Sequence, residues 1–389
     1  MIWKIQELKS GLVFSIYFCY VKAKVYVFHY DLNFKIPGGT SRGVLRQKRT
    51  YFLYAQYNEN WGIGECNLFE GLSYDDRPDF DEKIQRIVRW VENNFELFFE
   101  PSTTIKSFEE LNDLNQYPSI QFGLEQLKKS YLNEDSFCLF DTDFYAEEYG
   151  ITINGLIWMG QRDFMTRQIE EKIQSGFRCL KMKIGAIDFE TELSILKNIR
   201  SKFSADQLEL RVDANGAFDQ NTALEKLQRL SDFNIHSIEQ PIAVKQWHEM
   251  AELVAKSPIK IALDEELISL RNSQEMSSCL ETIKPDYIIL KPGLLGGFEI
   301  GDQYIEEAQK LEIGWWITSA LESNIGLNAI SQWTSGKNTT MPQGLGTGSL
   351  YTNNIESPLQ IENSKLFYKK GLNWNLKPIV DHYVYRTGI

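Results

Sequence analysis

The sequence lacks an excess of positive charge, and this disfavours one large class of partners. It has 41 Lys and Arg residues against 53 Asp and Glu residues, which gives a formal net charge of −12. A chain with this balance, and without an evident basic patch, repels phosphate backbones. Nucleic acid binding is therefore not expected.

Paired cysteines and clustered histidines are also missing. The five cysteines are scattered and include no C-x-x-C pair, so a disulfide framework is not expected and a reducing compartment such as the cytoplasm is favoured. The four histidines lie far apart in the sequence, which argues against a histidine-based zinc site. These residues are Cys19, Cys66, Cys138, Cys179 and Cys279, and His29, His236, His248 and His382.

No apolar run is long enough to cross a bilayer as a helix. The longest candidate, "GLVFSIYFCYV" at 11–21, is too short. It ends in Lys22-Ala23-Lys24 rather than in an A-x-A-like cleavage site, so it does not resemble a signal peptide. We expect residues 1–21 to be an N-terminal extension, with a membrane anchor or signal segment as the less favoured alternative, and we expect no membrane partner. The sequence makes no prediction about oligomeric state.

The chain also has no Pro- or Ser-rich linker and no simple repeat, and its 389 residues suggest about two domains. Residues 22–148 predict an α+β domain, because segments rich in β-branched and aromatic residues at 22–34 and 49–57 precede two helical patterns. The helical patterns are "FDEKIQRIVRWVENNF" and "PSIQFGLEQLKKSYL". Between the strands, residues 35–48 contain Pro37, Gly38, Gly39 and Gly43 and predict a lid loop.

Residues 149–350 alternate short apolar strands with amphipathic helices, which predicts a parallel sheet. Eight strands over about 200 residues favour a (β/α)-type barrel over an open sheet. We expect the irregular, aromatic-rich segment 351–389 to pack on the first domain. The predicted strands are 149–157, 178–184, 208–213, 235–239, 259–264, 286–291, 314–319 and 343–348.

Polar residues recur at the ends of these strands, where barrels of this type place their chemistry. Counted from Lys183, the steps between successive strand-end residues are 30, 26, 25, 27 and 28 residues, or about one strand–helix unit each. Side chains alternate along a strand, so Lys181 and Lys183 share one face. The series is Lys181 and Lys183, Asp213 and Asn215, Glu239, Asp264 and Glu265, Lys291, and then Ser319, Glu322 and Ser323.

Each of these residues taken alone has an ordinary structural explanation. Asp213 and Asp264 suit helix N-caps, and a single Glu at a strand end is usually a solvated rim residue. Together they are hard to explain in this way, because burying several charges without a partner is costly. Mg²⁺ is a suitable partner, since it prefers oxygen ligands and leaves positions for water and substrate.

A lysine pair, a metal ion and a third lysine suit proton abstraction beside a carboxylate. The metal stabilises the negative charge that develops, and the nearby Lys181 and the metal favour the neutral form of Lys183 that a base requires. Lys291 is then a second acid or base, or a fixed cation. Arg211 shares a strand face with Asp213 and is a candidate for contacting a second substrate carboxylate, although an internal salt bridge explains it equally well.

The segments "KMK", "DAN", "EQP", "DE" and "LKPG" resemble the enolase superfamily in its muconate-lactonizing-enzyme-like group, over nearly the whole chain from residue 22. The resemblance implies a modified TIM-type (β/α)7β barrel with an α+β capping domain and a closing loop at 35–48. It implies Mg²⁺, with Mn²⁺ as a possible substitute, and the ligands Asp213, Glu239 and Asp264. Lys183 is then the base and Lys291 the opposing lysine, while Lys181, Asn215 and Glu265 support them.

The reaction is less clearly indicated than the superfamily. "ITSALESNIGL" at 317–327 and "QGLGTG" at 343–348 are similar to o-succinylbenzoate synthases. That resemblance implies dehydration of 2-succinyl-6-hydroxy-2,4-cyclohexadiene-1-carboxylate through an enediolate, in menaquinone biosynthesis, with Arg211, Ser319 and Ser323 as substrate-binding candidates. An N-succinylamino acid racemase is an alternative. A dipeptide epimerase is less favoured, because 343–354 has no Asp-x-Asp pair. A non-catalytic ligand-binding barrel is the third alternative.

Overall fold

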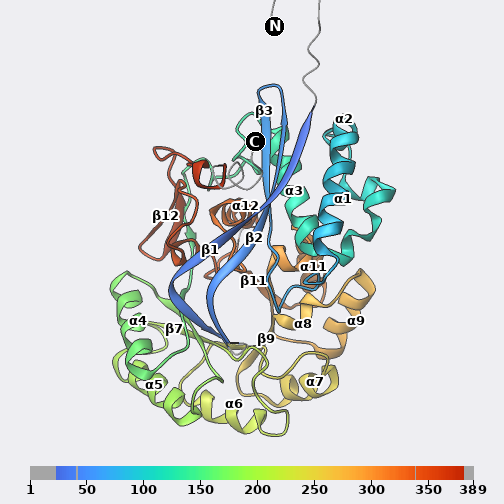
Figure 1. Ribbon diagram of the computed structural model, residues 1–389. Coiled ribbons are helices and arrows are strands. Elements are labelled where there is room, and N and C mark those ends of the chain that lie inside the picture. Colours follow the sequence, from blue (N-terminus) through green and yellow to red (C-terminus); the bar gives the residue numbers. More distant parts are fainter. Residues whose placement is uncertain (1–22, 41–42, 338, 381–389) are drawn as a thin grey trace, which may run out of the picture.

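The computed structural model describes residues 23–40, 43–337 and 339–380, so the expected N-terminal extension at 1–21 lies outside the described residues. The described strands form a three-stranded sheet near the N-terminus, a seven-stranded sheet, and a further three-stranded sheet near the C-terminus. Figure 1 shows the first sheet crossing in front of the strands of the second, with helices around the outside.

The capping part pairs β1 (Lys24–Thr40) with β2 (Gly43–Tyr57) and β2 with β3 (Asn60–Cys66), all antiparallel. Helix α3 (Pro118–Leu132) lies against β3 at such close range that a Cβ on Gly64 would stand 2.1 Å from the Gly123 carbonyl oxygen. Only glycine fits there. The other helical elements of this part are α1 (Phe80–Asn93), α2 (Phe95–Phe98), η1 (Ile105–Ser107), η2 (Glu109–Gln116) and α3 (Pro118–Leu132).

The seven-stranded sheet is parallel in the strand order β11-β10-β9-β8-β7-β6-β5. Its strands are β5 (Gly155–Ile157), β6 (Cys179–Lys183), β7 (Glu209–Asp213), β8 (Ser237–Glu239), β9 (Lys260–Leu263), β10 (Tyr287–Leu290) and β11 (Gly314–Ile317). The apolar residues on their outer face pack against the helices and form one large core. The prediction of an α/β barrel with a capping domain is confirmed.

The helices that follow the strands form an arc around them in Figure 1. The long ones are α4 (Arg162–Gln174), α5 (Phe189–Lys202), α6 (Ala223–Ser231), α7 (Trp247–Lys256), α9 (Ser273–Ile283), α11 (Phe298–Lys310) and α12 (Asn324–Ser335). Two one-turn helices, α8 (Glu265–Ile268) and α10 (Pro292–Leu295), begin directly after the residues that end β9 and β10. Both therefore sit at the end of the barrel where the predicted polar residues lie.

The expected strand at 343–348 is not a regular strand. Gln343 and Gly344 make single parallel bridges to Ile153 and Thr318, and these bridges link the two ends of the seven-stranded sheet. Pro342 and three nearby glycines explain the difference, because they weaken a continuous ladder. The side chain of Gln343 instead accepts the backbone N–H of Ile317 at 2.7 Å.

The expected strand at 149–157 divides into two short strands. Its first half, β4 (Ile151–Thr152), joins the C-terminal strands β12 (Leu359–Glu362) and β13 (Lys365–Tyr368) in a separate sheet. Only the second half, β5, enters the barrel. The segment after residue 351 packs beside the barrel through this sheet and also against the first domain, as expected: Tyr351 bridges Phe34, the Asn353 amide donates to the Asp31 carbonyl at 2.9 Å, and Trp374 stacks on Phe137.

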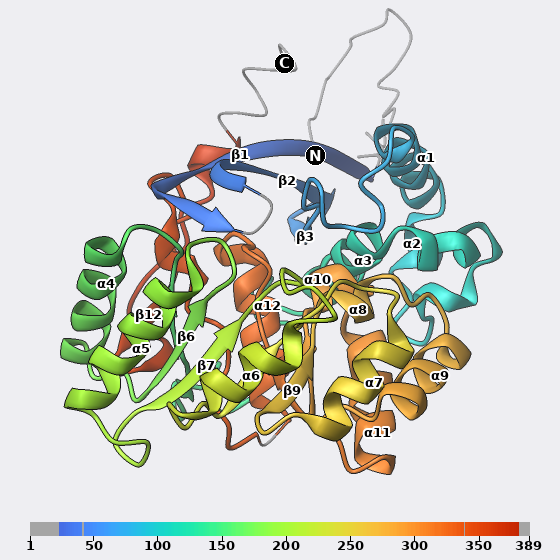
Figure 2. The ribbon, with the colours of Figure 1, turned by 90° about the horizontal axis from the view of Figure 1, so that it is seen from below.

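Residues 35–40 and 43–48, expected as part of a loop, continue β1 and β2 as a hairpin. The register shifts between Asn33 and Gly38, which accommodates Pro37 as a bulge-like irregularity. Figure 2 shows this hairpin lying across one end of the barrel. Its contacts include Gly38, where an added Cβ would be 2.9 Å from the Trp158 ring. The hairpin thus covers the end at which the polar residues gather.

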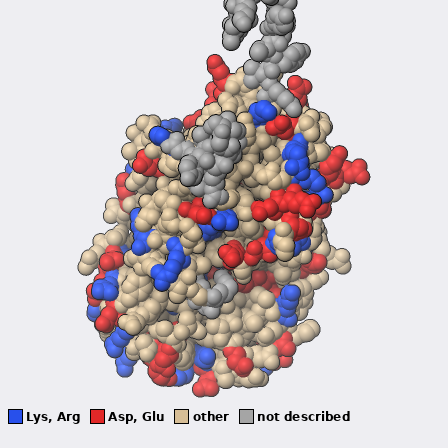
Figure 3. Space-filling model, in the orientation of Figure 1, with Lys and Arg blue, Asp and Glu red and all other residues tan. Residues whose placement is uncertain are grey.

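Among the described residues, no helix is both long and apolar enough to cross a membrane. The face shown in Figure 3 carries acidic and basic side chains interspersed with uncharged ones.

Candidate active site

A cavity lies between the carboxyl ends of the barrel strands and the capping part. Its charged side brings together many of the predicted residues, namely Lys181, Lys183, Asp213, Asn215, Glu265 and Lys291. Its apolar wall comes from both parts of the molecule and consists of Leu45, Phe69, Leu72, Leu156, Trp158, Leu294, Ala320 and Leu321. The cavity can therefore hold an organic molecule against a strongly charged surface.

Strand register brings the charged residues into contact. In the parallel ladder Lys183 lies opposite Asp213, and Asp213 lies opposite Glu239. Asp264 follows the next strand, β9, and Lys291 follows β10. Side chains at the ends of adjacent parallel strands meet at one edge, so residues 108 positions apart in sequence share one site.

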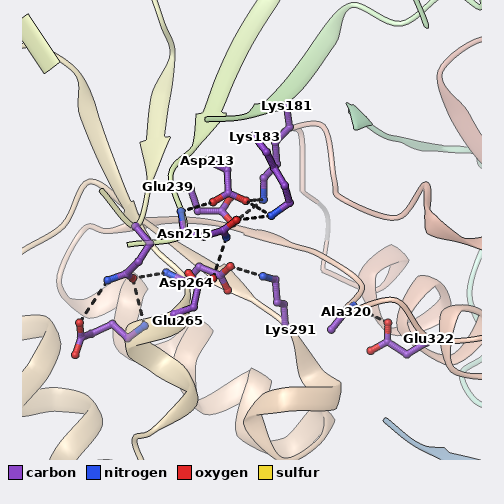
Figure 4. A network of polar contacts seen from close by, with 12 residues as sticks. Lys181, Lys183, Asp213, Asn215, Glu239, Asp264, Glu265, Lys291, Ala320 and Glu322 are labelled. Atoms are coloured by element: carbon purple, nitrogen blue, oxygen red, sulfur yellow. Dashed lines mark hydrogen bonds and ion pairs between the residues drawn. The ribbon is translucent and has the colours of Figure 1, made fainter. Parts of the chain in front are cut away.

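Ion pairs tie the lysines of β6 to the carboxylates of β7 and β8. Nζ of Lys181 is 2.9 Å from Oδ2 of Asp213 and 2.6 Å from Oε1 of Glu239. Nζ of Lys183 is 3.1 Å from the same Asp213 oxygen and donates to Oδ1 of Asn215 at 2.6 Å. Figure 4 shows both ammonium groups directed at this carboxylate pair.

Lys291 approaches the cluster from a different strand. Its ammonium forms an ion pair with Oδ2 of Asp264, while Asn215 donates its amide to Oε1 of Glu265 at 2.9 Å. In Figure 4 Lys291 reaches Asp264 from below, whereas Lys181 and Lys183 approach the cluster from above. The carboxylates therefore lie between lysines from two parts of the barrel.

Burial and charge act in opposite directions on these groups. Burial alone would lower the pKa of Lys181, but Asp213 and Glu239 outweigh it and raise that pKa. Burial likewise opposes ionisation of Asp213, yet Lys181 and Lys183 hold its pKa well below the usual value. Burial and the neighbouring Asp213 raise the pKa of Glu239. The ammonium groups thus compensate the carboxylates only in part.

Asp213, Glu239 and Asp264 form a donor set that suits a hard divalent cation. All three are at most 2 % exposed, and all three supply oxygen ligands, which Mg²⁺ prefers. In the part of the chain that the structure describes, no three acidic, histidine or cysteine side chains are gathered closely enough to hold an ion. Instead, each of these carboxylates forms an ion pair with a lysine ammonium group. The residues fit a metal ion in chemistry and in strand position.

Arg211 does not line this cavity, although the sequence made it a candidate for contacting a second substrate carboxylate. It stands two residues before Asp213, so it shares that face but lies one strand repeat deeper. Its guanidinium donates to Oε1 of Glu209 at 2.7 Å and to the Pro342 carbonyl at 2.9 Å, and it stacks over Trp316. The alternative role, an internal salt bridge, is the one observed.

The Arg211→Met variant should therefore lose stability and keep its substrate affinity. Methionine fills much of the volume but removes the ion pair with Glu209 and leaves the partly buried Pro342 carbonyl without its donor, which should cost about 1 kcal/mol of unfolding free energy. Urea denaturation measures the loss, and KM for the substrate serves as the control. A KM raised about tenfold in a variant of unchanged stability would restore Arg211 as a substrate contact.

The two serine candidates have different positions. Ser319 lines the cavity, with its hydroxyl in contact with Thr347 Oγ1 at 2.7 Å and the Gly344 carbonyl at 3.1 Å. Ser323 lies outside it: its hydroxyl caps α12 and donates to Oε2 of Glu65 at 2.6 Å.

Three polar residues that line the cavity, Asn154, Thr318 and Thr347, were missed from the sequence. Asn154 lies just before β5, and Thr318 follows β11 with its hydroxyl buried and without a hydrogen-bond partner among the described residues. Thr318 is 27 residues after Lys291 and shares the inward face of Trp316, so strand alternation applied strictly would have chosen it in place of Ser319.

The barrel, the cap and the strand-end lysines and carboxylates define a class of protein. Residues 165–372 match the family model described as enolase C-terminal domain-like. The chain therefore belongs to the enolase superfamily, as its motifs predicted.

Within that superfamily the chain is a homologue of the o-succinylbenzoate synthases. It is 45% identical over 355 residues to the o-succinylbenzoate synthase of Desulfotalea psychrophila, covering 86% of this chain and 96% of the relative. The crystal structure of MenC from D. psychrophila matches with a TM-score of 0.78 and 42% identity, over 89% of this chain and 99% of that one. A more distant relative is the N-succinyl-L-Arg/Lys racemase of Bacillus cereus, 25% identical over 48% of each chain.

Proposed function

We propose that this protein is an o-succinylbenzoate synthase, a hydro-lyase that dehydrates 2-succinyl-6-hydroxy-2,4-cyclohexadiene-1-carboxylate in menaquinone biosynthesis. The observation that carries the proposal is the pair formed by Lys183 and Lys291. They reach one carboxylate cluster from β6 and from the end of β10, and both line the same cavity. A carbon acid seated there has a base on one side and a cation on the other. A cytoplasmic location is part of this proposal.

Lys183 moves the proton in this scheme. Its Nζ takes the proton beside the ring carboxylate, and the electron pair of that C–H bond moves toward the carboxylate. The same Nζ, now an ammonium, gives the proton to the departing hydroxyl, so the C–O bond breaks and water leaves with formation of the aromatic ring. Lys291 stays protonated and faces the negative charge as it develops.

Mg²⁺ is part of the proposal, with Asp213, Glu239 and Asp264 as the residues that would hold it. When bound, it would act as a Lewis acid for the substrate carboxylate. The charge count supports a divalent cation: three lysines face four carboxylates, those of Asp213, Glu239, Asp264 and Glu265. With Lys183 neutral, two ammonium groups and one divalent cation would balance these four negative charges.

The shape of the cavity suits a cyclic substrate with two carboxylates. The apolar wall, which includes Leu156 and Trp158, can cover a six-membered ring. The cavity is also lined by uncharged polar groups, among them Asn154, Thr318 and Ser319, and these are the candidates for the succinyl carboxylate in place of Arg211.

The test is a dehydration assay on the cyclohexadiene substrate, run beside N-succinyl amino acids in deuterium oxide. We expect rapid formation of o-succinylbenzoate. N-succinylamino acid racemase activity is the second candidate, favoured by the relationship to the B. cereus enzyme and by the shared first proton transfer. Exchange of the α-proton of N-succinyl amino acids for deuterium, with no dehydration, would replace the first proposal by the second.

A further inference from the structure

A second buried charge cluster lies between the cap and the barrel, outside the cavity. It consists of Lys48 on β2, Glu65 on β3 and Glu322 in the segment between β11 and α12. The three residues are 6 %, 0 % and 0 % exposed. Buried charges are costly unless they are paired or hydrogen-bonded. None of these side chains lines the cavity of the proposed active site.

Glu65 fixes the start of α12. Its carboxylate accepts the backbone N–H groups of Ser323 and Gly326 at 2.9 and 2.8 Å and the Ser323 hydroxyl at 2.6 Å. These are the otherwise unpaired donors of a helix N-terminus, where a negative charge is stabilising. A carboxylate of the cap thereby holds a helix of the barrel.

Glu322 fixes the cavity wall that precedes this helix. Its Oε2 accepts the Ala320 backbone N–H at 2.6 Å, and its Oε1 accepts the Asn67 amide of the cap at 2.7 Å. The next wall residue, Leu321, has a φ of +65°, a left-handed conformation that a branched side chain adopts only when its surroundings impose it. The wall at Ala320 and Leu321 is therefore held in a strained shape from the cap side.

The same carboxylate packs against the segment that carries Lys291. A Cβ added to Gly293 would stand 2.6 Å from Oε1 of Glu322 and 2.9 Å from the Asn67 amide nitrogen. Gly293 lies two residues after Lys291, in the one-turn helix α10. A shift of Glu322 would therefore disturb both the wall and the opposing lysine.

Lys48 supplies the positive charge of this cluster. Its ammonium is buried and has no hydrogen-bond partner among the described residues. Burial lowers the pKa of Lys48, and the charges of Glu65 and Glu322 oppose this by favouring the ammonium form. Lys48 shares its face of β2 with Thr50, whose hydroxyl donates to Oε1 of Glu65 at 2.7 Å, so the ammonium lies on the side of the strand that faces this carboxylate.

We propose that Lys48 is a positioning residue: its ammonium offsets the charges of Glu65 and Glu322, and these carboxylates then hold the wall at Ala320 and Leu321 and the Lys291 segment in their reactive places. Its effect on turnover rests on the proposed function, whereas its effect on the wall does not. Lys48 acts through other residues and makes no contact with the substrate.

The cluster should respond to pH near neutrality. Burial and the Glu65 carboxylate raise the pKa of Glu322 to about 7, while Lys48 opposes them. The ionisable groups that face Glu322 are Lys48 from β2, Glu65 from β3 and Tyr351 after η3 (Thr347–Leu350); on the α10 side it meets Gly293. Glu322 is ionised above its pKa, so the wall should be held above about pH 7 and loosened below it. Loss of Lys48 should move this transition to higher pH.

The experiment compares the Lys48→Met variant with Lys83→Met, which removes another buried lysine of the cap, 4 % exposed and paired with Asp113. We expect kcat/KM of Lys48→Met at pH 7 to fall on the order of ten- to hundredfold, mostly because KM rises. The increase of KM on acidification should begin at least one pH unit higher than in wild type. Lys83→Met and the charge-retaining Lys48→Arg should stay within a few-fold of wild type. Equal kinetics and pH profiles for Lys48→Met and wild type would overturn the proposal.

A double variant keeps the test decisive if the single variant folds poorly. Lys48→Met with Glu322→Gln removes one positive and one negative charge, so it should fold better than Lys48→Met. Its KM should no longer rise on acidification, because the titrating carboxylate is absent. A double variant that shows the full defect of Lys48→Met together with its pH profile would rule out charge balance as the cause.

Hydrogen exchange separates this proposal from the proposed function. Without any substrate, the backbone amides of Ala320, Ser323 and Gly326 should exchange faster in Lys48→Met than in wild type or Lys83→Met. An inactive wild-type enzyme would refute the proposed function alone. Unchanged exchange at these three amides would refute the positioning role alone.

Discussion

The Lys183→Ala variant should lose at least about 10³-fold in kcat for dehydration. Lys183 is proposed to take the substrate proton and return it to the leaving hydroxyl, and general acid–base groups typically contribute 10²–10⁴-fold each time they act. The fold should survive, because Lys181 still pairs with Asp213 and Glu239. The measurement is steady-state kinetics, with circular dichroism and thermal unfolding as checks of structure.

Lys202→Ala is the matched control for this variant. Lys202 lies at the end of α5, its side chain is 51 % exposed, and its ammonium is 3.6 Å from Glu170. Such a surface pair contributes little, so activity and stability should stay close to wild type. Dehydration by Lys183→Ala at more than a tenth of the wild-type rate would show that Lys183 is not the base.

The Asp213→Asn variant should require at least about 100-fold more Mg²⁺ for half-maximal activity. It removes one of three proposed carboxylate ligands, and even substitutions beyond the ligands commonly cost 10- to 100-fold in metal affinity. It also removes one charged partner from each of Lys181 and Lys183, which keep Glu239 and Asn215, so it should cost about 1–3 kcal/mol of unfolding free energy. A Mg²⁺ titration of activity gives the first quantity and urea denaturation the second.

The Mg²⁺-dependent rise in melting temperature provides a readout that does not depend on turnover. Wild-type protein should be stabilised by Mg²⁺, whereas Asp213→Asn should show little stabilisation at the same concentration. Asp219→Asn, an exposed residue six positions further along the same loop, is the control and should behave as wild type. A normal Mg²⁺ response in Asp213→Asn would contradict the assignment of this ligand.

Much of the charged site could be predicted because barrel geometry turns sequence spacing into proximity. One strand–helix unit separates Lys183, Asp213, Glu239, Asp264 and Lys291, and the structure brings these residues together. The alternation of side chains along a strand gives the face on which a residue lies but not its depth in the barrel. The correct face was therefore predicted for Arg211, but not that it lies deeper than the cavity, two residues before Asp213. The end of β11 was placed two residues late, at 319 instead of Ile317, and this favoured Ser319 over Thr318.

Features that depend on packing between distant segments could not be read from the sequence. The contact between Glu65 and Ser323 joins residues 258 positions apart, and no local sequence pattern predicts it. The hairpin continuation of β1 and β2 is another example, because Pro37 and the glycines read locally as a loop while cross-strand pairing extends past them. In the same way, Gln343 replaces a regular eighth strand with a side-chain hydrogen bond to Ile317.

The most direct test of the account is a crystal structure of the wild-type protein with Mg²⁺ and o-succinylbenzoate. The account predicts one ion bound by Asp213, Glu239 and Asp264, with the ring carboxylate of the product at the ion and the ring between Lys183 and Lys291. Product bound in the cavity with these three carboxylates still paired to lysines and no ion among them would contradict it.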